Sequence, residues 1–172
     1  MKEQLKTDFE KIQKVSSFSS KDVETKRFYL DKFIKRGFPN RKLENWKFLD
    51  LDKIINKSIN ELSFYNDYST TNKIDTSIFI DGLEHNKIIF INGRIEKIDF
   101  SYEDKNKIEI FDDFKIDYKF DNNNSLIDLN KAFSNKYFKV LIKKGYSIKK
   151  PLIIYHLTNE KMESKNINLR LD

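Results

Sequence analysis

The spacing of the apolar residues changes along this chain, and that change limits the possible folds more than any other feature. Residues 2–15 place Leu5, Phe9 and Ile12 on one face of a helix, the pattern of an amphipathic helix. From residue 87 onward, short apolar runs are separated by turn residues, as in β-strands. The sequence therefore predicts an α+β fold with a helical region first and strands after it.

A second helix is predicted to begin after Ser19 or Ser20, either of which can cap it, and to end near Arg36. Gly37 stands where a helix-ending glycine in the left-handed conformation is expected, and Pro39 follows two residues on. The apolar stripe of this helix is predicted to contain Val23, Arg27, Leu30 and Ile34, widened by Phe28, Tyr29 and Phe33.

Shorter elements are predicted in the middle of the chain. Residues 50–62 resemble a short helix, and residues 77–80 could form a strand within a polar stretch. Asn92–Gly93 between apolar runs predicts a β-hairpin, because both central residues of such a turn need positive φ. Residues 125–136 predict a short helix with Ser125 as cap and Asp128 at its third position.

The C-terminal part has the pattern of β-structure. Strands are predicted at residues 137–142 and after Pro151, with a turn at Lys144–Gly145 between them. Residues 167–171 alternate apolar and polar, which predicts a third strand that ends at the last residue. Since natural proteins usually cover such a strand edge, we expect the chain to be a fragment of a larger β-structure.

The residue types leave little room for catalysis. The chain has no cysteine, which excludes disulfides, a thiolate nucleophile and cysteine-ligated clusters within these residues. His85 and His156 have no carboxylate at ligand spacing, and the four glycines are scattered rather than gathered in a phosphate loop. We predict no catalytic, metal-binding or cofactor-binding residue, and therefore a protein that is not an enzyme.

The charge is modest and mixed along the sequence. The net charge of +6 comes from 33 basic and 27 acidic residues, which leaves a weakly basic nucleic-acid-binding module as one alternative. The N-terminus lacks the apolar segment of a secretory signal, and no window approaches the roughly 20 apolar residues of a membrane span. We expect a cytoplasmic protein without a membrane partner.

The segment "RGFPNRKLENWKFLDL", residues 36–51, gathers a helix stop, several charges and the only tryptophan. Arg41 and Glu44 have the spacing of a helical ion pair. The apolar residues Trp46, Phe48 and Leu49 are expected to anchor the helical region on its neighbour.

The same segment resembles the N-terminal signature of the SufB/SufD family of iron–sulfur cluster assembly proteins, in its SufD branch. The matching residues are Arg41, Glu44, Trp46, Lys47 and Phe48. Three further segments resemble the family in the same order. They are "IIFINGRI" with Asn92, Gly93 and Arg94, "LIDLNKAF" with Leu129–Phe133, and "VLIKKGYSIKKPLIIYHLT" with Gly145, Lys150, Pro151 and His156.

The resemblance implies a fold and a role. It implies a helical region over residues 1–62, a mixed α/β region over 63–136, and over 137–172 the first strands of a truncated right-handed parallel β-helix. It implies a scaffold subunit of the SUF assembly complex, whose partners are a SufB-like subunit and a SufC-like ATPase.

The iron–sulfur cluster is expected on the full complex, since the family's cluster-handling residues match no position here. The alternative is a non-catalytic protein-interaction domain unrelated to cluster assembly.

Overall fold

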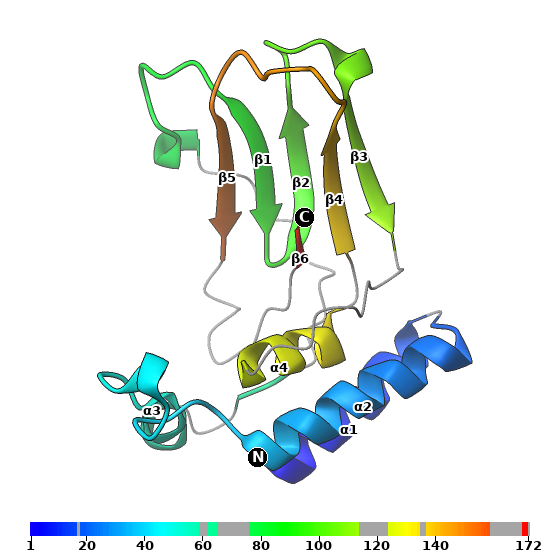
Figure 1. Ribbon diagram of the computed structural model, residues 1–172, viewed down its shortest axis with the longest axis vertical. Coiled ribbons are helices and arrows are strands. Elements are labelled where there is room, and N and C mark those ends of the chain that lie inside the picture. Colours follow the sequence, from blue (N-terminus) through cyan, green and yellow to red (C-terminus); the bar gives the residue numbers. More distant parts are fainter. Residues whose placement is uncertain are drawn as a thin grey trace. The chain divides into compact units, whose positions relative to one another are not determined.

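The computed structural model describes residues 1–16, 18–58, 62–64, 76–113, 124–134, 137–158 and 170–171. The fold is α+β, as predicted (Figure 1). The chain divides into two units, each considered by itself below. The first comprises Met1–Asn66, Asp113–Tyr137 and Ser164–Arg170, and the second comprises Asp67–Asp112, Phe138–Glu163 and Leu171–Asp172.

The first unit is built on helices α1 (Lys2–Val15), α2 (Ser20–Arg36), α3 (Leu51–Ser58) and α4 (Ser125–Phe133). The predicted helices are confirmed, but α4 ends at Phe133, short of the predicted residue 136, and Leu62 at the predicted end of the third helix is not helical. Residues 59–61 lie outside the described residues. Helix α4 packs along α2, and the Phe133 ring meets the Phe9 ring of α1 edge to face at 6.1 Å. The buried core of this unit consists of Leu5, Phe9, Ile12, Tyr29, Leu30, Phe33, Phe38, Ile55, Phe64, Leu129, Ala132 and Phe133.

Both ends of α2 show why the helix stops and starts where it does. Ser19 caps it, since its hydroxyl accepts the Asp22 N–H while the Asp22 carboxylate accepts the Ser19 N–H. At the other end Gly37 has φ +73° and ψ −171°. The positive φ was predicted, but this ψ lies outside the left-handed helical region. It belongs to an extended region open almost only to glycine.

The predicted stripe of α2 is confirmed for Tyr29, Leu30 and Phe33, but it wrongly includes Phe28 and leaves out Lys26. The residues that α2 buries are Lys26, Tyr29, Leu30 and Phe33. Phe28, expected within the stripe, is 57% exposed, and Arg27 also lies on the surface. The prediction left out Lys26 because lysine is usually a surface residue, whereas the partners of this lysine lie on α4.

The predicted cap of α4 is displaced by one residue. Asn124 caps the helix, and its side-chain oxygen accepts the N–H of Leu126. Ser125 is therefore the first helical residue, and Asp128 lies one position beyond the third. Because of this shift the Asp128 carboxylate has no capping role, and it pairs with cations on α2 instead.

The loop between α2 and α3 contradicts two expectations from its sequence. Phe48 is 86% exposed and Leu49 is 43% exposed, so neither anchors the helical region. Trp46 is only half-buried, in the 3₁₀ turn η1 (Glu44–Trp46). Glu44 pairs with Lys47 at 3.3 Å, rather than with Arg41 as predicted. Phe48 and Leu49 thus lie on the outer surface of this segment.

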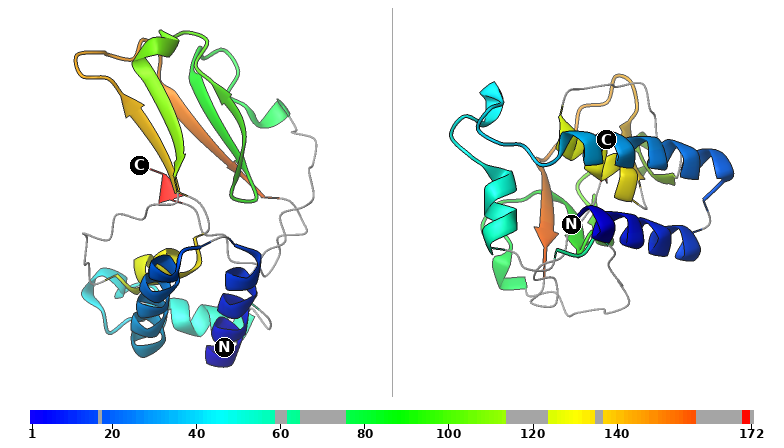
Figure 2. Two further views of the ribbon diagram at one scale, coloured as in Figure 1. Left: turned by 90° about the vertical axis from the view of Figure 1, so that its right-hand side faces the viewer. Right: turned by 90° about the horizontal axis from the view of Figure 1, so that it is seen from below.

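The second unit contains strands β1 (Asn86–Ile91), β2 (Arg94–Asp99) and β5 (Leu152–Leu157) in one sheet, in the order β2-β1-β5. Strands β3 (Ile108–Asp113), β4 (Tyr137–Ile142) and β6 (Arg170–Leu171) form another, in the order β3-β4-β6. The rings of Phe90 on β1 and Phe138 on β4 meet at 5.5 Å, and Figure 2 shows the two sheets from the side.

The β1–β2 hairpin is confirmed. Ile91 pairs with Arg94, so Asn92 and Gly93 form a two-residue turn. Their φ values of +51° and +82° are the positive pair that such a turn requires. The register shifts between Ile89 and Phe90, whose partners are Lys97 and Ile95, so Glu96 is the extra residue of a bulge in β2.

Strand β5 joins β1 as a parallel neighbour. The register runs without interruption from Asn86 opposite Leu152 to Ile91 opposite Leu157. The strands predicted on both sides of the turn at Lys144–Gly145 are confirmed. The strand suggested at residues 77–80 is wrong, because η2 (Thr76–Ile78) is a 3₁₀ turn. Of the last predicted strand, residues 167–169 lie outside the described residues.

We expect two phenylalanines of the first unit to differ sharply in their contribution to stability. Phe33 is 1% exposed, so Phe33→Ala should lower the free energy of unfolding by about 3–5 kcal/mol. Phe48→Ala should change it by no more than about 0.5 kcal/mol, because the ring is solvated already. Urea unfolding followed by circular dichroism measures both. A large loss in Phe48→Ala would contradict the exposed position.

Candidate functional site

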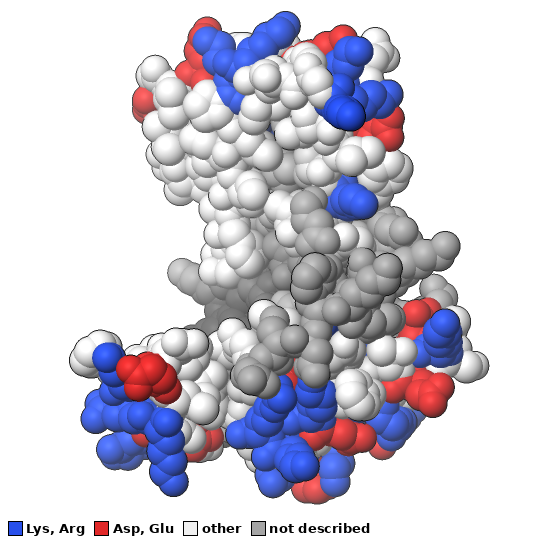
Figure 3. All heavy atoms as spheres, viewed as in Figure 1, with Lys and Arg blue, Asp and Glu red and all other residues white. Residues whose placement is uncertain are grey.

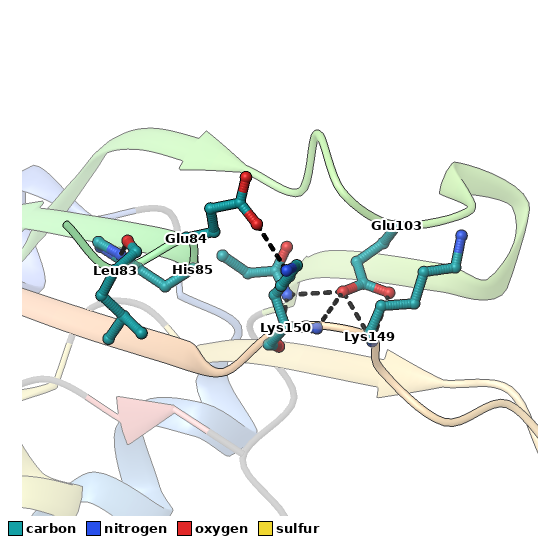
Figure 4. A network of polar contacts seen from close by, with 7 residues as sticks. Leu83, Glu84, His85, Glu103, Lys149 and Lys150 are labelled. Carbon is teal, nitrogen blue, oxygen red and sulfur yellow. Dashed lines mark hydrogen bonds and ion pairs between the residues drawn. The ribbon is translucent and has the colours of Figure 1, made fainter.

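The most connected polar cluster in the second unit centres on the Glu103 carboxylate, which lies in the turn after β2 (Figure 4). Glu103 is 8% exposed. Its oxygens accept hydrogen bonds from Asn86 Nδ2 at 2.8 Å and from the Tyr146 hydroxyl at 2.7 Å. They also accept the backbone N–H groups of Lys149 at 3.0 Å and Lys150 at 3.1 Å. One side chain thus ties the start of β1 to the turn before β5.

Asn86 is the second member of this cluster and is fully buried. Its Nδ2 also donates to the Lys150 carbonyl at 2.8 Å, and its backbone N–H donates to the Pro151 carbonyl at 2.8 Å. Because both partners of Nδ2 are acceptors, the orientation of the amide is fixed. Asn86 Oδ1 finds no hydrogen-bond partner among the described residues.

The hydrogen bonds decide the charge of Glu103. Burial alone would raise the pKa of its carboxyl, since the ionised form loses water. The donors from Asn86, Tyr146, Lys149 and Lys150 outweigh that effect and lower the pKa of Glu103 to about 2. The carboxylate is therefore ionised at neutral pH and fully engaged by donors from its own chain.

His85 lies in a second buried chain of polar groups. Its Nδ1 is 2.6 Å from the Leu83 carbonyl, so Nδ1 carries the proton and donates. Its Nε2 then accepts from the Tyr155 hydroxyl at 2.8 Å, and that hydroxyl accepts the Ile80 N–H. Both ring nitrogens are thus occupied, which is the arrangement of a structural histidine.

His156 lies on β5, and the centres of its ring and the Phe90 ring are 6.2 Å apart in an edge-to-face arrangement. Partial burial lowers its pKa. The two histidines are not brought together into one site. Within the described ranges, no three side chains of the metal-ligating types gather in one place.

The first unit has its own buried charges where α2 meets α4. The Lys26 ammonium, 1% exposed, donates to the carbonyls of Ser134 and Lys131 at the C-terminal end of α4. Helix ends of this kind favour a cation. The Lys131 ammonium in turn donates to the Tyr29 hydroxyl at 3.3 Å and lies 4.5 Å from the centre of that ring. Lysine side chains from both helices thus join α2 and α4 at one end of the helix pair.

Two buried carboxylates complete this unit. Asp128 of α4 lies 2.9 Å from Arg36 Nη1 and 3.6 Å from Lys32 Nζ, both on α2. Asp8 of α1 is fully buried and accepts the Phe64 N–H at 2.8 Å, together with Gln4 Nε2 and Lys11 Nζ. Each carboxylate joins an element to a distant part of the chain.

These clusters hold backbone segments in place. The donors of the Glu103 cluster point at the Glu103 carboxylate, and the buried Lys26 of α2 points at carbonyls at the end of α4. Their buried charges fix the relation between segments far apart in sequence.

Comparisons with known proteins add no identification. Neither the scan against protein-family models nor the search of curated proteins finds a match to this chain. No helix in the described part of the chain has the length and apolar character needed to cross a membrane.

The burial of Lys26, Asp8 and Glu103 was not predicted from the sequence. Their partners lie 105, 56 and 46 residues away along the chain. The available signal was weak: each is a charged residue beside an apolar stripe or turn, where a solvated side chain is the usual outcome.

Acid should lower the free energy of unfolding, partly through protonation of Glu103. Since its pKa falls from 4.5 to about 2 on folding, it stabilises the fold fully above pH 4.5. That contribution is lost as the pH falls toward 2. Glu103→Gln should therefore be less stable at pH 7, and its stability should converge with that of the wild type as the pH falls. Urea midpoints at a series of pH values measure this, with exposed Glu96→Gln as control. Parallel curves would contradict the prediction.

Raising the pH should increase the free energy of unfolding through Lys26. Burial, only partly offset by Asp22, lowers its pKa from 10.5 to about 8. Between these pH values the unfolded chain binds a proton that the folded chain does not, so the free energy of unfolding rises with pH. At about 1.4 kcal/mol per tenfold change in proton affinity, the rise approaches about 3 kcal/mol. Lys26→Met should remove this rise. The exposed Lys35→Met on the same helix should keep it, and equal slopes would contradict the assignment.

Proposed function

We propose that this chain is a non-catalytic scaffold subunit, similar to SufD, of a SUF-type iron–sulfur cluster assembly complex. The observation that carries the proposal is the parallel, in-register pairing of β1 with β5. These strands belong to "IIFINGRI" and "VLIKKGYSIKKPLIIYHLT", two of the segments that resemble the family. Segments that resemble the family in sequence are thus direct neighbours in space.

The turns of these segments support the same proposal. Asn92 and Gly93 have the conformation that an Asn-Gly hairpin needs, and Gly145 has φ +81° in the turn before β5. Tyr146, Lys149 and Lys150 of that turn bind Glu103. The residues shared with the family pattern therefore have structural roles in positioning strands.

The finer part of the proposal is a right-handed parallel β-helix that begins with this pairing. A parallel β-helix stacks strands from successive turns of the chain in register, each with the next. The β1–β5 pair has that relation, with β2, β3 and β4 between the two in sequence. Parallel strands are usually buried on both faces, so the pair favours a larger β-structure over an isolated hairpin.

The role follows from what the buried groups do. The described charge clusters fix backbone geometry, and the chain has no cysteine with which to hold a cluster by itself. Iron and sulfide would accordingly be handled by the assembled complex, with a SufB-like subunit and a SufC-like ATPase as partners. A general protein-interaction domain remains the alternative from the same geometry.

One observation bears on the nucleic-acid alternative. The backbone N–H of Lys143 binds the Lys107 carbonyl at 2.9 Å, which brings two lysine-rich turns side by side. However, Lys143 pairs with Glu109 at 2.9 Å and Lys150 pairs with Glu84 at 2.6 Å. These carboxylates offset part of the positive charge, so the site is a weak candidate for a phosphate backbone.

The test is association with purified SufB-type and SufC-type subunits from the same genome. We expect the complete chain to co-elute with at least one of them in size-exclusion chromatography. A SufD subunit of known assembly serves as positive control, and retention on DNA at several salt concentrations tests the alternative. If neither subunit binds while the control assembles, the assembly proposal is overturned. Retention on DNA that falls steeply with salt would favour the nucleic-acid alternative.

A further inference from the structure

The loop between α2 and α3, residues 39–51, is closed at its base and braced along its length. The Pro39 carbonyl accepts the N–H groups of Leu51 at 3.0 Å and Asp52 at 3.2 Å, which joins the two ends. Further bonds connect Leu43 to Asn40, Trp46 to Leu43 and Leu49 to Trp46, at 2.8–3.1 Å. A surface loop of this length with joined ends is an Ω-loop, a type that is frequently functional.

The base of loop 39–51 is embedded in the core of the first unit. Phe38 is 5% exposed, and its ring meets that of Phe33 edge to face at 5.0 Å. Pro39 is buried as well, and Ile55 of the following helix is 7% exposed. The outer part of the loop is therefore presented on a fixed support.

The outer part of the loop exposes apolar side chains close together in sequence. Phe48 is 86% exposed, Leu43 is 48% exposed and Leu49 is 43% exposed. Ile54, just beyond the loop on α3, is 42% exposed. Single exposed apolar residues are common, but several on one braced loop mark a surface that can bind a partner.

Charged residues surround these apolar side chains. Arg41 and Lys42 are exposed, and the Lys47 ammonium lies 5.1 Å from the centre of the Phe48 ring. The same ammonium pairs with Glu44 at 3.3 Å. Figure 3 shows both signs of charge next to uncharged surface around α3. Over residues 41–49 the three cations exceed the single carboxylate, so the rim is positive on balance.

We propose that loop 39–51 docks a folded protein partner, which receives Phe48 in an apolar pocket bordered by carboxylates. An aromatic anchor within a charged rim is the usual anatomy of a protein interface. Because the loop is already braced, little conformational entropy is lost when it binds. The rim mixes the Glu44 carboxylate with cations, as is usual for the polar rim of a protein interface, whereas an anionic bilayer recruits clusters of cations alone. A protein with carboxylates around a pocket therefore fits this surface better.

The identity of the partner rests on the proposed function, so purified SufB-type and SufC-type subunits are the probes. Phe48→Ala in the complete chain should weaken binding to the subunit that the wild type binds by at least about tenfold. Phe28→Ala is the matched control, since Phe28 is 57% exposed on α2 with a lysine ammonium 5.7 Å from its ring. Arg41→Glu with Lys42→Glu should slow association and reduce its dependence on salt. Thermal midpoints verify that all variants fold.

Each outcome decides the proposal. Selective loss in Phe48→Ala, with Phe28→Ala unchanged, supports the docking surface. Equal binding by wild type and Phe48→Ala overturns it and leaves the proposed function standing. Binding of the wild type to neither subunit overturns both. Retention on phosphatidylserine vesicles that depends on Phe48, without binding to either subunit, overturns the protein partner in favour of a bilayer.

Discussion

The second unit depends on one buried carboxylate. An ionised group out of water is costly unless donors replace its hydration, and Glu103 receives its donors from Asn86, Tyr146, Lys149 and Lys150. The Glu103 carboxylate and its donors come from three segments: the start of β1, the turn after β2 and the turn before β5. None of the three can take another position without leaving a charge unpaired. Because an unpaired buried charge is costly, the hydrogen bonds to Glu103 restrict the register of these segments. The parallel pairing of β1 with β5 follows from that restriction.

The first unit uses the same physics with the signs reversed. The Lys26 ammonium is held by carbonyls at the C-terminal end of α4, where the helix dipole supplies partial negative charge. At the other end of the helix pair, Asp128 takes the cations Lys32 and Arg36. Two oppositely charged contacts, one toward each end of α2, fix how α4 lies along it. Apolar packing alone would allow α4 to slide, whereas misplaced charges would be left without partners.

The parts of this fold that follow from the sequence are those with local causes. The capping box of Ser19 and Asp22 and the turn Asn92–Gly93 each involve neighbours within three residues, so the pattern contains the whole interaction. The burial of Lys26 on α2 could not be predicted in this way, because its partners are carbonyls at the end of α4. Glu103 is a similar case, since its donors Lys149 and Lys150 are distant in sequence. The sequence alone does not show whether a charged side chain has a buried partner or is surrounded by water.

The segment around Trp46 shows the opposite error, in which an apolar residue was expected to be buried. Composition alone suggests that aromatic and leucine side chains anchor helices, because burial is their usual stabilising role. Here the backbone of loop 39–51 satisfies its own hydrogen bonds, and Phe38 and Pro39 already fill the space at its base. Phe48 and Leu49 are thus left outside a loop that is stable without them. Residues that a fold does not need for its own stability, held rigidly at its surface, are explained best by an interaction with another molecule.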